Sequence, residues 1–214
     1  MELPVSIPTI DAAVAMRTIS GYKDQRVAAS ALYQPKIKEL KGRNAADIKR
    51  IQDALHFAIT IAYAQGLAML HEASSALNMD IPLADVVKIW RGGCIIRSSL
   101  LEVFYKAYQK DKSLGNILLN KNIARIVKKA DRNARAVIKL AVQSKIPVTA
   151  LSSALGYFDA FCSATMPTNL IQAQRDLFGA HTYQRIDKEG TFHTEWNEDA
   201  VQAQKHLAET KNPQ

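Results

Sequence analysis

The sequence predicts an all-α protein, and three observations support this fold class. Apolar residues recur at steps of three and four through most of the chain, the spacing that places them on one face of an α-helix. Convincing alternation of apolar and polar residues between turn signals, typical of a half-buried strand, is absent. Apolar residues make up 48% of the 214 residues and charged residues 22%, which indicates a folded protein with one sizeable core.

The longest predicted helix begins after Asn44, a residue suited to cap a helix N-terminus. Its expected apolar face runs for about nine turns. Apolar or small residues on that face are Ile48, Ile51, Leu55, Ile59, Ala62, Gly66, Met69, Ala73 and Leu77. Phe57 and Ile61 widen this face, so we expect the helix to be surrounded by neighbouring helices. Pro82 begins the next helix.

The remaining helices follow from the same periodicity and from helix-breaking residues. We expect them at residues 9–20, 25–32, 83–110, 123–144 and 147–178. Gly92-Gly93 predicts a break or a close helix approach in the third of these, and Pro167 predicts a kink or break in the last.

The chain changes character after Tyr183, where a polar stretch leads into the aromatic segment Thr191–Trp196. That segment has a weak strand pattern, and residues 199–210 could form a terminal helix. The aromatic rings of the 191–196 segment need a surface on which to be buried. A groove on the same chain and a groove on a second subunit both meet that need. We predict a helical domain over residues 1–184 and a C-terminal tail over residues 185–214.

Charge and cysteine usage narrow the function classes. The formal net charge is +8, with basic and acidic residues interspersed, which favours anionic ligands without choosing among them. Cys94 and Cys162 lie far apart in apolar stretches, so we expect buried, reduced thiols, a cytoplasmic protein and no metal site. No secretory signal is visible. Charges interrupt the apolar stretches before about 18 residues, so no membrane span is expected.

The sequence contains neither a GxGxxG loop nor a P-loop, so it shows no site for a nicotinamide cofactor or ATP. The segment Trp90–Ser98 places two arginines beside paired glycines. It is either an anion pocket at a helix N-terminus or a close helix crossing with its arginines tied to carboxylates, and we favour the crossing. His56 and His71 are expected to be packing or capping residues.

Arg175 and His181 form the constellation whose chemistry points to a ligand. They lie six residues apart, where an apolar helix runs into a turn containing Gly179. A guanidinium group offers a fixed fork of donors for phosphate or carboxylate. An imidazole adds a donor that is charged or neutral near physiological pH. Arg17, on a short amphipathic helix, would by itself be a surface arginine.

Several motifs together resemble the all-helical C-terminal domain of the decarboxylating 6-phosphogluconate dehydrogenases, over residues 11–196. Their shared order along the chain is far more specific than any single match. The motifs are Tyr22–Ser30, Tyr63–Gly66, Trp90–Ser98, Lys145–Val148, Ser152–Leu155, Pro167–Tyr183 and Phe192–Trp196.

This resemblance implies an NADP-dependent enzyme that oxidises 6-phosphogluconate and releases carbon dioxide and ribulose 5-phosphate, in the pentose phosphate pathway. It implies a homodimer built on the helical domain, with each tail reaching into the other subunit's active site. Arg17 matches the family arginine that binds the substrate phosphate. Arg175 matches the tail-side arginine on the same phosphate, and His181 matches the histidine that accompanies it.

The family's dinucleotide-binding domain and its lysine and glutamate acid–base pair would precede this sequence, so no residue here is assigned a catalytic role. We expect a C-terminal portion of the enzyme, inactive alone, with an N-terminal dinucleotide-binding polypeptide encoded separately, lost or omitted. The segment after Trp196 departs from the family pattern, so no NADP contact is assigned there. The alternatives are a helical dimerisation module with a relic site and, ranked last, a nucleic-acid binder.

Overall fold

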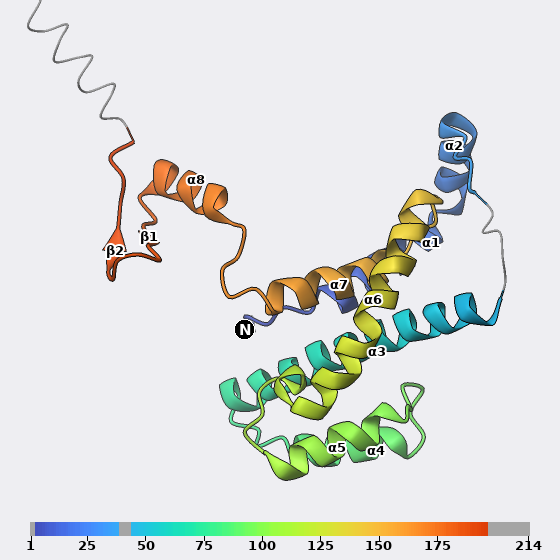
Figure 1. Cartoon of the computed structure of the whole chain (residues 1–214), viewed down its shortest axis with the longest axis horizontal. Helices are drawn as coiled ribbons and strands as arrows, with labels where there is room; N and C mark the ends of the chain where they lie inside the picture. The colour runs from blue at the N-terminus through green and yellow to red at the C-terminus, as the bar shows by residue number, and fades with distance from the viewer. Residues whose placement is uncertain (1–2, 39–43, 197–214) are drawn as a thin grey trace, which may run out of the picture. The chain divides into compact units, whose positions relative to one another are not determined.

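The computed structural model describes residues 3–38 and 44–196, and within them the chain is almost entirely helical, which confirms the all-α fold class (Figure 1). It divides into two compact units, residues 1–162 (unit 1) and 163–214 (unit 2). The boundary that we expected between 184 and 185 therefore falls inside unit 2. The helix expected at 199–210 lies outside the described residues.

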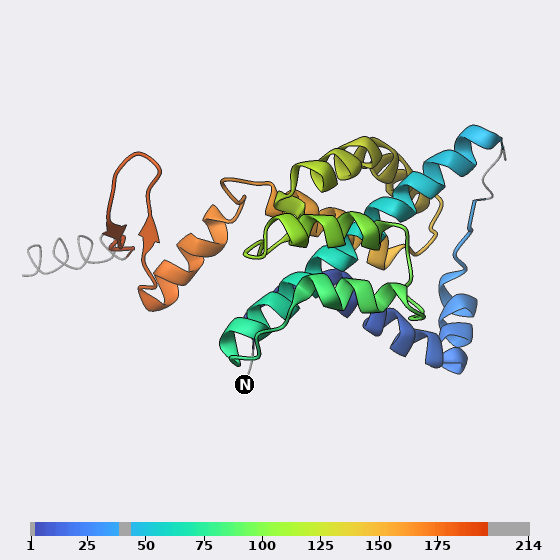
Figure 2. The same ribbon diagram turned by 90° about the horizontal axis from the view of Figure 1, so that it is seen from below.

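Unit 1 contains the predicted helices with shifted bounds. They are α1 (Pro8–Gly21), α2 (Lys23–Tyr33), α3 (Ala45–Ala76), α4 (Leu83–Arg91), α5 (Leu100–Lys110), α6 (Lys121–Gln143) and α7 (Thr149–Phe161), and a 3-10 turn that was not predicted, η1 (Ile117–Leu119), lies between α5 and α6. Figures 1 and 2 show α3 running through unit 1, and it contacts α1, α4, α6, α7 and η1. The Asn44 side chain caps α3 as predicted, accepting a hydrogen bond from the Asp47 backbone N–H at 2.9 Å.

The core of unit 1 forms where these helices meet α3. Its largest fully buried apolar side chains come from α3, α4, α5, α6 and η1. They are Phe57, Ile61, Leu67, Val87, Leu101, Phe104, Tyr108, Ile117, Ile123 and Val127. Burial of apolar area on this scale is the main force that holds a helical unit of this size together.

The expected core face of α3 is not its buried face, and the difference is largest over the first half of the helix. Ile48, Ile51 and Leu55 are 62%, 52% and 58% exposed, whereas Phe57 and Ile61 are buried. The cause is that α3 is apolar on two sides. Helical periodicity identifies apolar faces but does not say which one meets the other helices of the same unit. The exposed apolar face, defined by Ile48, Ile51, Leu55 and Ile59, is called the outer face of α3 below.

By length and composition, α3 is a candidate membrane span among the described residues, contrary to the expectation from its charges. Half of its most apolar 18-residue window is buried inside the protein. Core helices of folded domains pass the same test of length and hydropathy, so this result is weak evidence for a membrane segment. The contacts of α3 with α6 and α7 account for its apolar composition.

The turn between α4 and α5 corrects two further expectations. Gly92 and Gly93 lie in an exposed turn rather than at a helix crossing, and Gly93 has a φ of 149°, which other residues rarely adopt. The Arg91 side chain is tied to a carboxylate, as the crossing interpretation expected, because it pairs with Glu102. Cys94 in this turn and Cys162 at the end of α7 are exposed, not buried, since both lie where a helix gives way to a turn.

Unit 2 consists of α8 (Asn169–Gly179) and a hairpin of two short antiparallel strands, β1 (Tyr183–Gln184) and β2 (Thr191–Phe192). Tyr183 pairs with Phe192, and Gln184 pairs with Thr191. The weak strand pattern near 191–196 therefore corresponds to a strand of two residues. The helix expected over 147–178 is divided into α7 and α8, with Pro167 in the connection.

The two sides of α3 predict different responses to the same substitution. Ile61 is fully buried, so we expect Ile61→Ala to lower the free energy of unfolding of unit 1 by about 2–5 kcal/mol. Ile51→Ala, on the outer face, should change it by less than about 0.5 kcal/mol. Urea unfolding followed by circular dichroism measures both. Equal losses for the two variants would contradict this assignment of faces.

Candidate functional site

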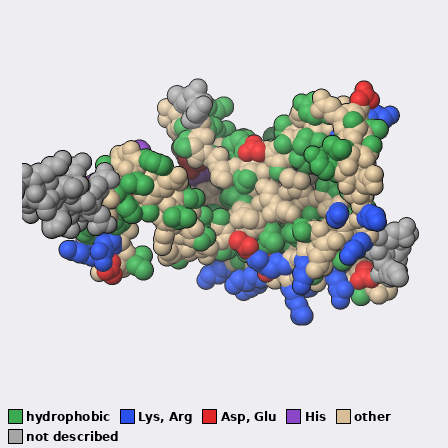
Figure 3. Space-filling view, turned by 90° about the horizontal axis from the view of Figure 1, so that it is seen from above, with side chains coloured by type: hydrophobic (Ala, Val, Ile, Leu, Met, Phe, Trp, Pro, Cys, Tyr) green, Lys and Arg blue, Asp and Glu red, His purple; other side chains and the backbone are tan. Residues whose placement is uncertain are grey.

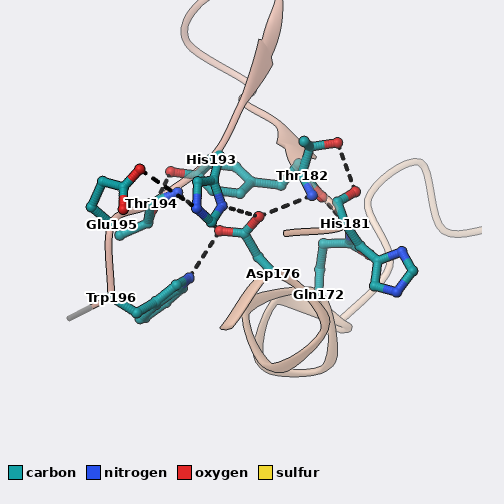
Figure 4. Close-up of polar contacts among 9 residues, drawn as sticks. Gln172, Asp176, His181, Thr182, His193, Thr194, Glu195 and Trp196 are labelled. Carbon is teal, nitrogen blue, oxygen red and sulfur yellow. Dashed lines mark hydrogen bonds and ion pairs between the residues drawn. The ribbon is translucent and has the colours of Figure 1, made fainter. Parts of the chain in front are cut away.

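The buried carboxylate of Asp176, on α8, is the centre of unit 2. Its Oδ1 accepts hydrogen bonds from the Thr182 backbone N–H and from His193 Nδ1, and its Oδ2 accepts them from the Thr194 backbone N–H and Trp196 Nε1. All four bonds are 2.9 Å long, and Figure 4 shows the donors converging on the carboxylate. We call these five residues the Asp176 network.

The network shifts the pKa values of its two titratable members, Asp176 and His193. Burial would raise the pKa of Asp176, but the hydrogen bonds from His193, Thr194, Trp196 and Thr182 outweigh it and hold that pKa well below its usual range. The hydrogen bond to Asp176 raises the pKa of His193, with the charges of Asp176 and Glu195 adding to the effect. An ionised Asp176 therefore faces a His193 that carries its proton on Nδ1.

The Asp176 network explains why the expected boundary at 184 is not where the units divide. It joins α8 to the turn after it and to the segment 193–196, so helix and hairpin fold as one unit. Sequence reasoning did not identify Asp176, His193 or Trp196 as partners. The available signal was the single acidic residue of α8, together with a later tryptophan-containing segment that lacked a burial partner.

Arg175 carries a charge that no carboxylate neutralises among the described residues. Its side chain is exposed, and Nη1 donates to the Gln172 Oε1 at 3.3 Å. The carboxylate adjacent in sequence, Asp176, is occupied by the four donors of its network. The remaining N–H groups of the guanidinium are thus free to bind an anion.

His181 lies in the tight turn that ends α8, residues 180–182. Ala180 and Thr182 on either side of it have positive φ angles of 49° and 60°. Its ring lies so close to Gly179 that a Cβ there would come within 3.1 Å of His181 Cδ2 and Nε2, so a side chain at position 179 would require the His181 ring to shift. In Figure 4 the His181 ring points away from the Asp176 carboxylate.

The structure relates Arg175 and His181 through one side chain. Gln172 accepts a hydrogen bond from Arg175 and donates one to the carbonyl of Thr182, the residue after His181. Arg17 belongs to unit 1, where it is exposed and its side chain has no partner among the described residues. Its joint action with Arg175 and His181 stays a prediction.

The helix that carries Arg17 is anchored by a buried amide. Gln65, fully buried on α3, accepts a hydrogen bond from the Thr9 backbone N–H at 2.9 Å and donates one to the Thr9 hydroxyl at 2.8 Å. These bonds satisfy a backbone donor of the first turn of α1, which has no partner within the helix. Arg17 lies about two turns further along α1, which also packs against α7.

A basic groove of about 630 Å³, formed by α3 and α6, was not predicted. It is lined by Arg50, Lys129, Arg132, Asn133 and Ala136, and Figure 3 shows Lys and Arg side chains gathered along one margin of the protein. Two of its polar residues are held by carboxylates of α3: Asp47 pairs with Arg50 at 3.1 Å, and Asp53 accepts from Asn133 at 2.8 Å. Among the described residues, no group of three or more His, Cys, Asp or Glu could hold a metal ion.

The Asp176 network predicts how the stability of unit 2 depends on pH. Asp176, with a lowered pKa, contributes fully above its unfolded value of about 3.9 and loses its contribution as the pH falls further. His193, with a raised pKa, contributes fully below about pH 6.5 and loses its contribution as the pH rises through its folded value. We therefore expect maximal stability between about pH 4 and 6.5.

NMR signals of the His193 ring and the Trp196 indole N–H, followed against pH, test this window. His193→Asn is the matched control, because an amide can donate to Asp176 without titrating. In this variant the loss of stability of unit 2 at higher pH should disappear. A His193 pKa at or below about 6.5 would contradict the prediction.

Replacing the central carboxylate should loosen unit 2. Asp176→Asn turns an NH₂ group toward two of the four donors, so we expect solvent exchange of the Thr182 and Thr194 amide protons to accelerate by about tenfold or more. Asp187→Asn is the control, since Asp187 is exposed and pairs only locally with Arg185 at 2.6 Å. Hydrogen exchange measured by NMR distinguishes them, and unchanged protection in Asp176→Asn would refute the network's structural role.

Comparison with known proteins identifies the family of this chain. A family model described as 6-phosphogluconate dehydrogenase, C-terminal domain, matches residues 1–196. The decarboxylating 6-phosphogluconate dehydrogenase of Lactococcus lactis subsp. lactis (strain IL1403) is 43% identical over 196 residues, and the NADP(+)-dependent decarboxylating enzyme of Bacillus subtilis (strain 168) is 43% identical over 197. Each match covers 92% of this chain and 42% of the relative.

A solved structure shows the same fold. It is the 6-phosphogluconate dehydrogenase of Plasmodium falciparum, studied in its apo form, with NADP+ and with 6-phosphogluconate, and it has a TM-score of 0.83 and 35% identity. The match covers 90% of this chain and 42% of that chain. The chain thus spans about 42% of the length of these relatives. Since the family model accounts for most of its residues, the chain belongs to the 6-phosphogluconate dehydrogenase family and carries that family's C-terminal domain.

Proposed function

We propose that this chain supplies substrate-phosphate binding and a dimer interface to an NADP-dependent, decarboxylating 6-phosphogluconate dehydrogenase of the cytoplasm. In this role it binds 6-phosphogluconate, which such enzymes convert to ribulose 5-phosphate and carbon dioxide. One observation carries the proposal: Gln172 contacts both Arg175 and the Thr182 carbonyl next to His181, and Arg175 keeps its charge free of carboxylates among the described residues.

Phosphate suits these side chains for a physical reason. A phosphate monoester carries close to two negative charges near neutral pH and has several strong acceptor oxygens. The free N–H groups of Arg175 can bind two of them, and the His181 imidazole can donate to another. Arg17, on α1, would add a second guanidinium. The dimer that the family resemblance implies would bring Arg175 and His181 of one subunit to Arg17 of the other.

The role of this chain is to position the substrate rather than to perform the chemistry. Binding energy gained at the phosphate, away from the reacting carbon, orients the sugar for reaction. Among the described residues there is no strand followed by a glycine-rich loop and a helix, the unit that holds a dinucleotide pyrophosphate, because the β-structure there is one short hairpin. These residues do not fit NADP, so its binding falls to a dinucleotide-binding domain outside them.

The exposed apolar surface supports the dimer part of the proposal. Besides the outer face of α3, α1 and α2 also carry exposed apolar side chains, among them Val14 at 61% and Leu32 at 74% exposure. In unit 2, Leu170 and Phe178 on α8 are 84% and 77% exposed. Apolar surface of this extent marks a protein–protein contact. A second copy of the chain and a dinucleotide-binding polypeptide are the partners that we propose.

The same apolar surface favours one alternative, a helical dimerisation module in which Arg175 and His181 no longer bind substrate. The two proposals differ in their response to ligand. The module would form its dimer without binding 6-phosphogluconate, and its properties would not change in Arg175→Ala.

Ligand titration tests the proposal. We expect the chain, purified from a host that lacks its own enzyme, to form no NADPH from 6-phosphogluconate. We also expect 6-phosphogluconate, but not gluconate, to shift the NMR signals of Arg175 and His181. Arg175→Ala should weaken binding by about tenfold or more, since a charge-assisted hydrogen bond is lost.

Arg185→Ala is the control variant, because Arg185 is an arginine of the same unit whose charge is paired with Asp187; it should leave binding within about twofold of the original. NADPH formation by this chain alone would refute the proposal that it positions the substrate without performing the chemistry. Absence of any response to 6-phosphogluconate would refute the substrate site and leave the dimerisation module.

A further inference from the structure

We propose that Gln172 is a positioning residue that fixes the Arg175 guanidinium and the turn carrying His181 in the geometry in which both bind one phosphate group. This inference rests on the proposed function and adds a residue to its site. Gln172 lies on α8, one turn before Arg175, and its side chain is partly buried. Its amide group contacts both parts of the site.

The two contacts of Gln172 require the two ends of an amide. Its Oε1 accepts from Arg175 Nη1, and its Nε2 donates to the Thr182 carbonyl. Arginine has only donors to offer and a carbonyl only acceptors, so just one orientation of the amide satisfies both. A carboxylate would face the carbonyl with an acceptor, and an apolar side chain would satisfy neither contact. Of these three kinds of side chain, only the amide makes both contacts.

The turn that carries His181 needs such anchors. Residues other than glycine rarely adopt positive φ, and a β-branched residue such as Thr182 is an outlier there. Such conformations persist only when surrounding contacts hold them. Thr182 is held at both backbone groups: its N–H donates to Asp176 and its carbonyl accepts from Gln172. Between them these two side chains determine where the preceding residue, His181, projects.

The neutral amide also leaves the charge of Arg175 available. An arginine oriented by a carboxylate loses much of its attraction for an anion, because the two charges compensate each other. Gln172 orients the guanidinium through one N–H and adds no charge. The network around Asp176 keeps the nearest carboxylate in sequence occupied elsewhere. The arrangement gives an oriented, unneutralised guanidinium, which is what recognition of phosphate requires.

Two nearly isosteric substitutions separate positioning from packing. Gln172→Met keeps the length and shape of the side chain without the amide, and Gln172→Glu keeps the shape and adds a charge. We expect Gln172→Met to weaken 6-phosphogluconate binding by about tenfold, and Gln172→Glu to weaken it by about a hundredfold because its carboxylate pairs with Arg175. Gln174→Glu, which adds the same charge to an exposed position of α8, should stay within about threefold.

The measurement is titration of the whole chain with 6-phosphogluconate and, separately, inorganic phosphate, followed by NMR. Signals of the Arg175 Nε–H and the His181 and Thr182 amides are recorded before ligand is added. In Gln172→Met all of these ligand-free signals should move toward their disordered positions, and in Gln172→Glu those of His181 and Thr182 should, while those of Thr194 in the same unit stay in place. Because a packing role depends only on shape, it predicts equal affinities for Gln, Met and Glu at this position.

The outcomes separate this inference from the function on which it rests. Binding by the original chain that is unchanged in Gln172→Met would overturn the positioning role and leave the proposed function intact. Absence of binding by the original chain would overturn the proposed function. The ligand-free signals would then still decide whether Gln172 positions Arg175, since unchanged Arg175 and His181 signals in Gln172→Met would overturn that role.

Discussion

Unit 2 depends on the burial of one charge. A carboxylate removed from water is costly unless hydrogen bonds replace its hydration, and Asp176 receives four such bonds from the turn after α8 and from residues 193–196. Three of the four donors lie 17 to 20 residues from Asp176 in the sequence, so local conformational preference does not bring them to it. Their convergence therefore defines the path of the chain from 180 to 196, including the hairpin and the positive-φ turn that presents His181.

Unit 1 is stabilised differently, because its helices are held together by apolar packing around α3. That helix has more apolar surface than its own unit covers, and the surplus forms the outer face. Exposed apolar surface of this kind supports the interface that we propose. The two units thus contribute separately to the proposed enzyme: unit 1 offers an interface and Arg17, while unit 2 offers the phosphate-binding pair.

The sequence predicted the all-α class, the approximate helices and the Asn44 cap, because helical periodicity and capping are local properties. It did not predict which face of α3 is buried, because that depends on which helices pack against it. Exposure of Cys94 and Cys162 was missed since apolar neighbours in sequence do not ensure burial. Arg175 and His181 were singled out by the chemistry of their side chains and by family resemblance, and their binding role stays a prediction. The supporting residues Asp176 and Gln172 were not predicted, because their roles depend on hydrogen-bond partners in residues 180–196 that only the folded structure brings to them.

The adjacency of Arg175 and Asp176 in the sequence suggests a local ion pair that would cancel the positive charge. The structure instead assigns the two charges to different tasks. The Asp176 carboxylate is buried in unit 2 and accepts four hydrogen bonds. The Arg175 side chain stays exposed and is oriented by the neutral amide of Gln172. A carboxylate thus organises the fold next to an arginine without neutralising it. Separation of the structural anion from the exposed cation is the condition under which so small a unit can hold a strained turn and still leave the Arg175 charge unneutralised.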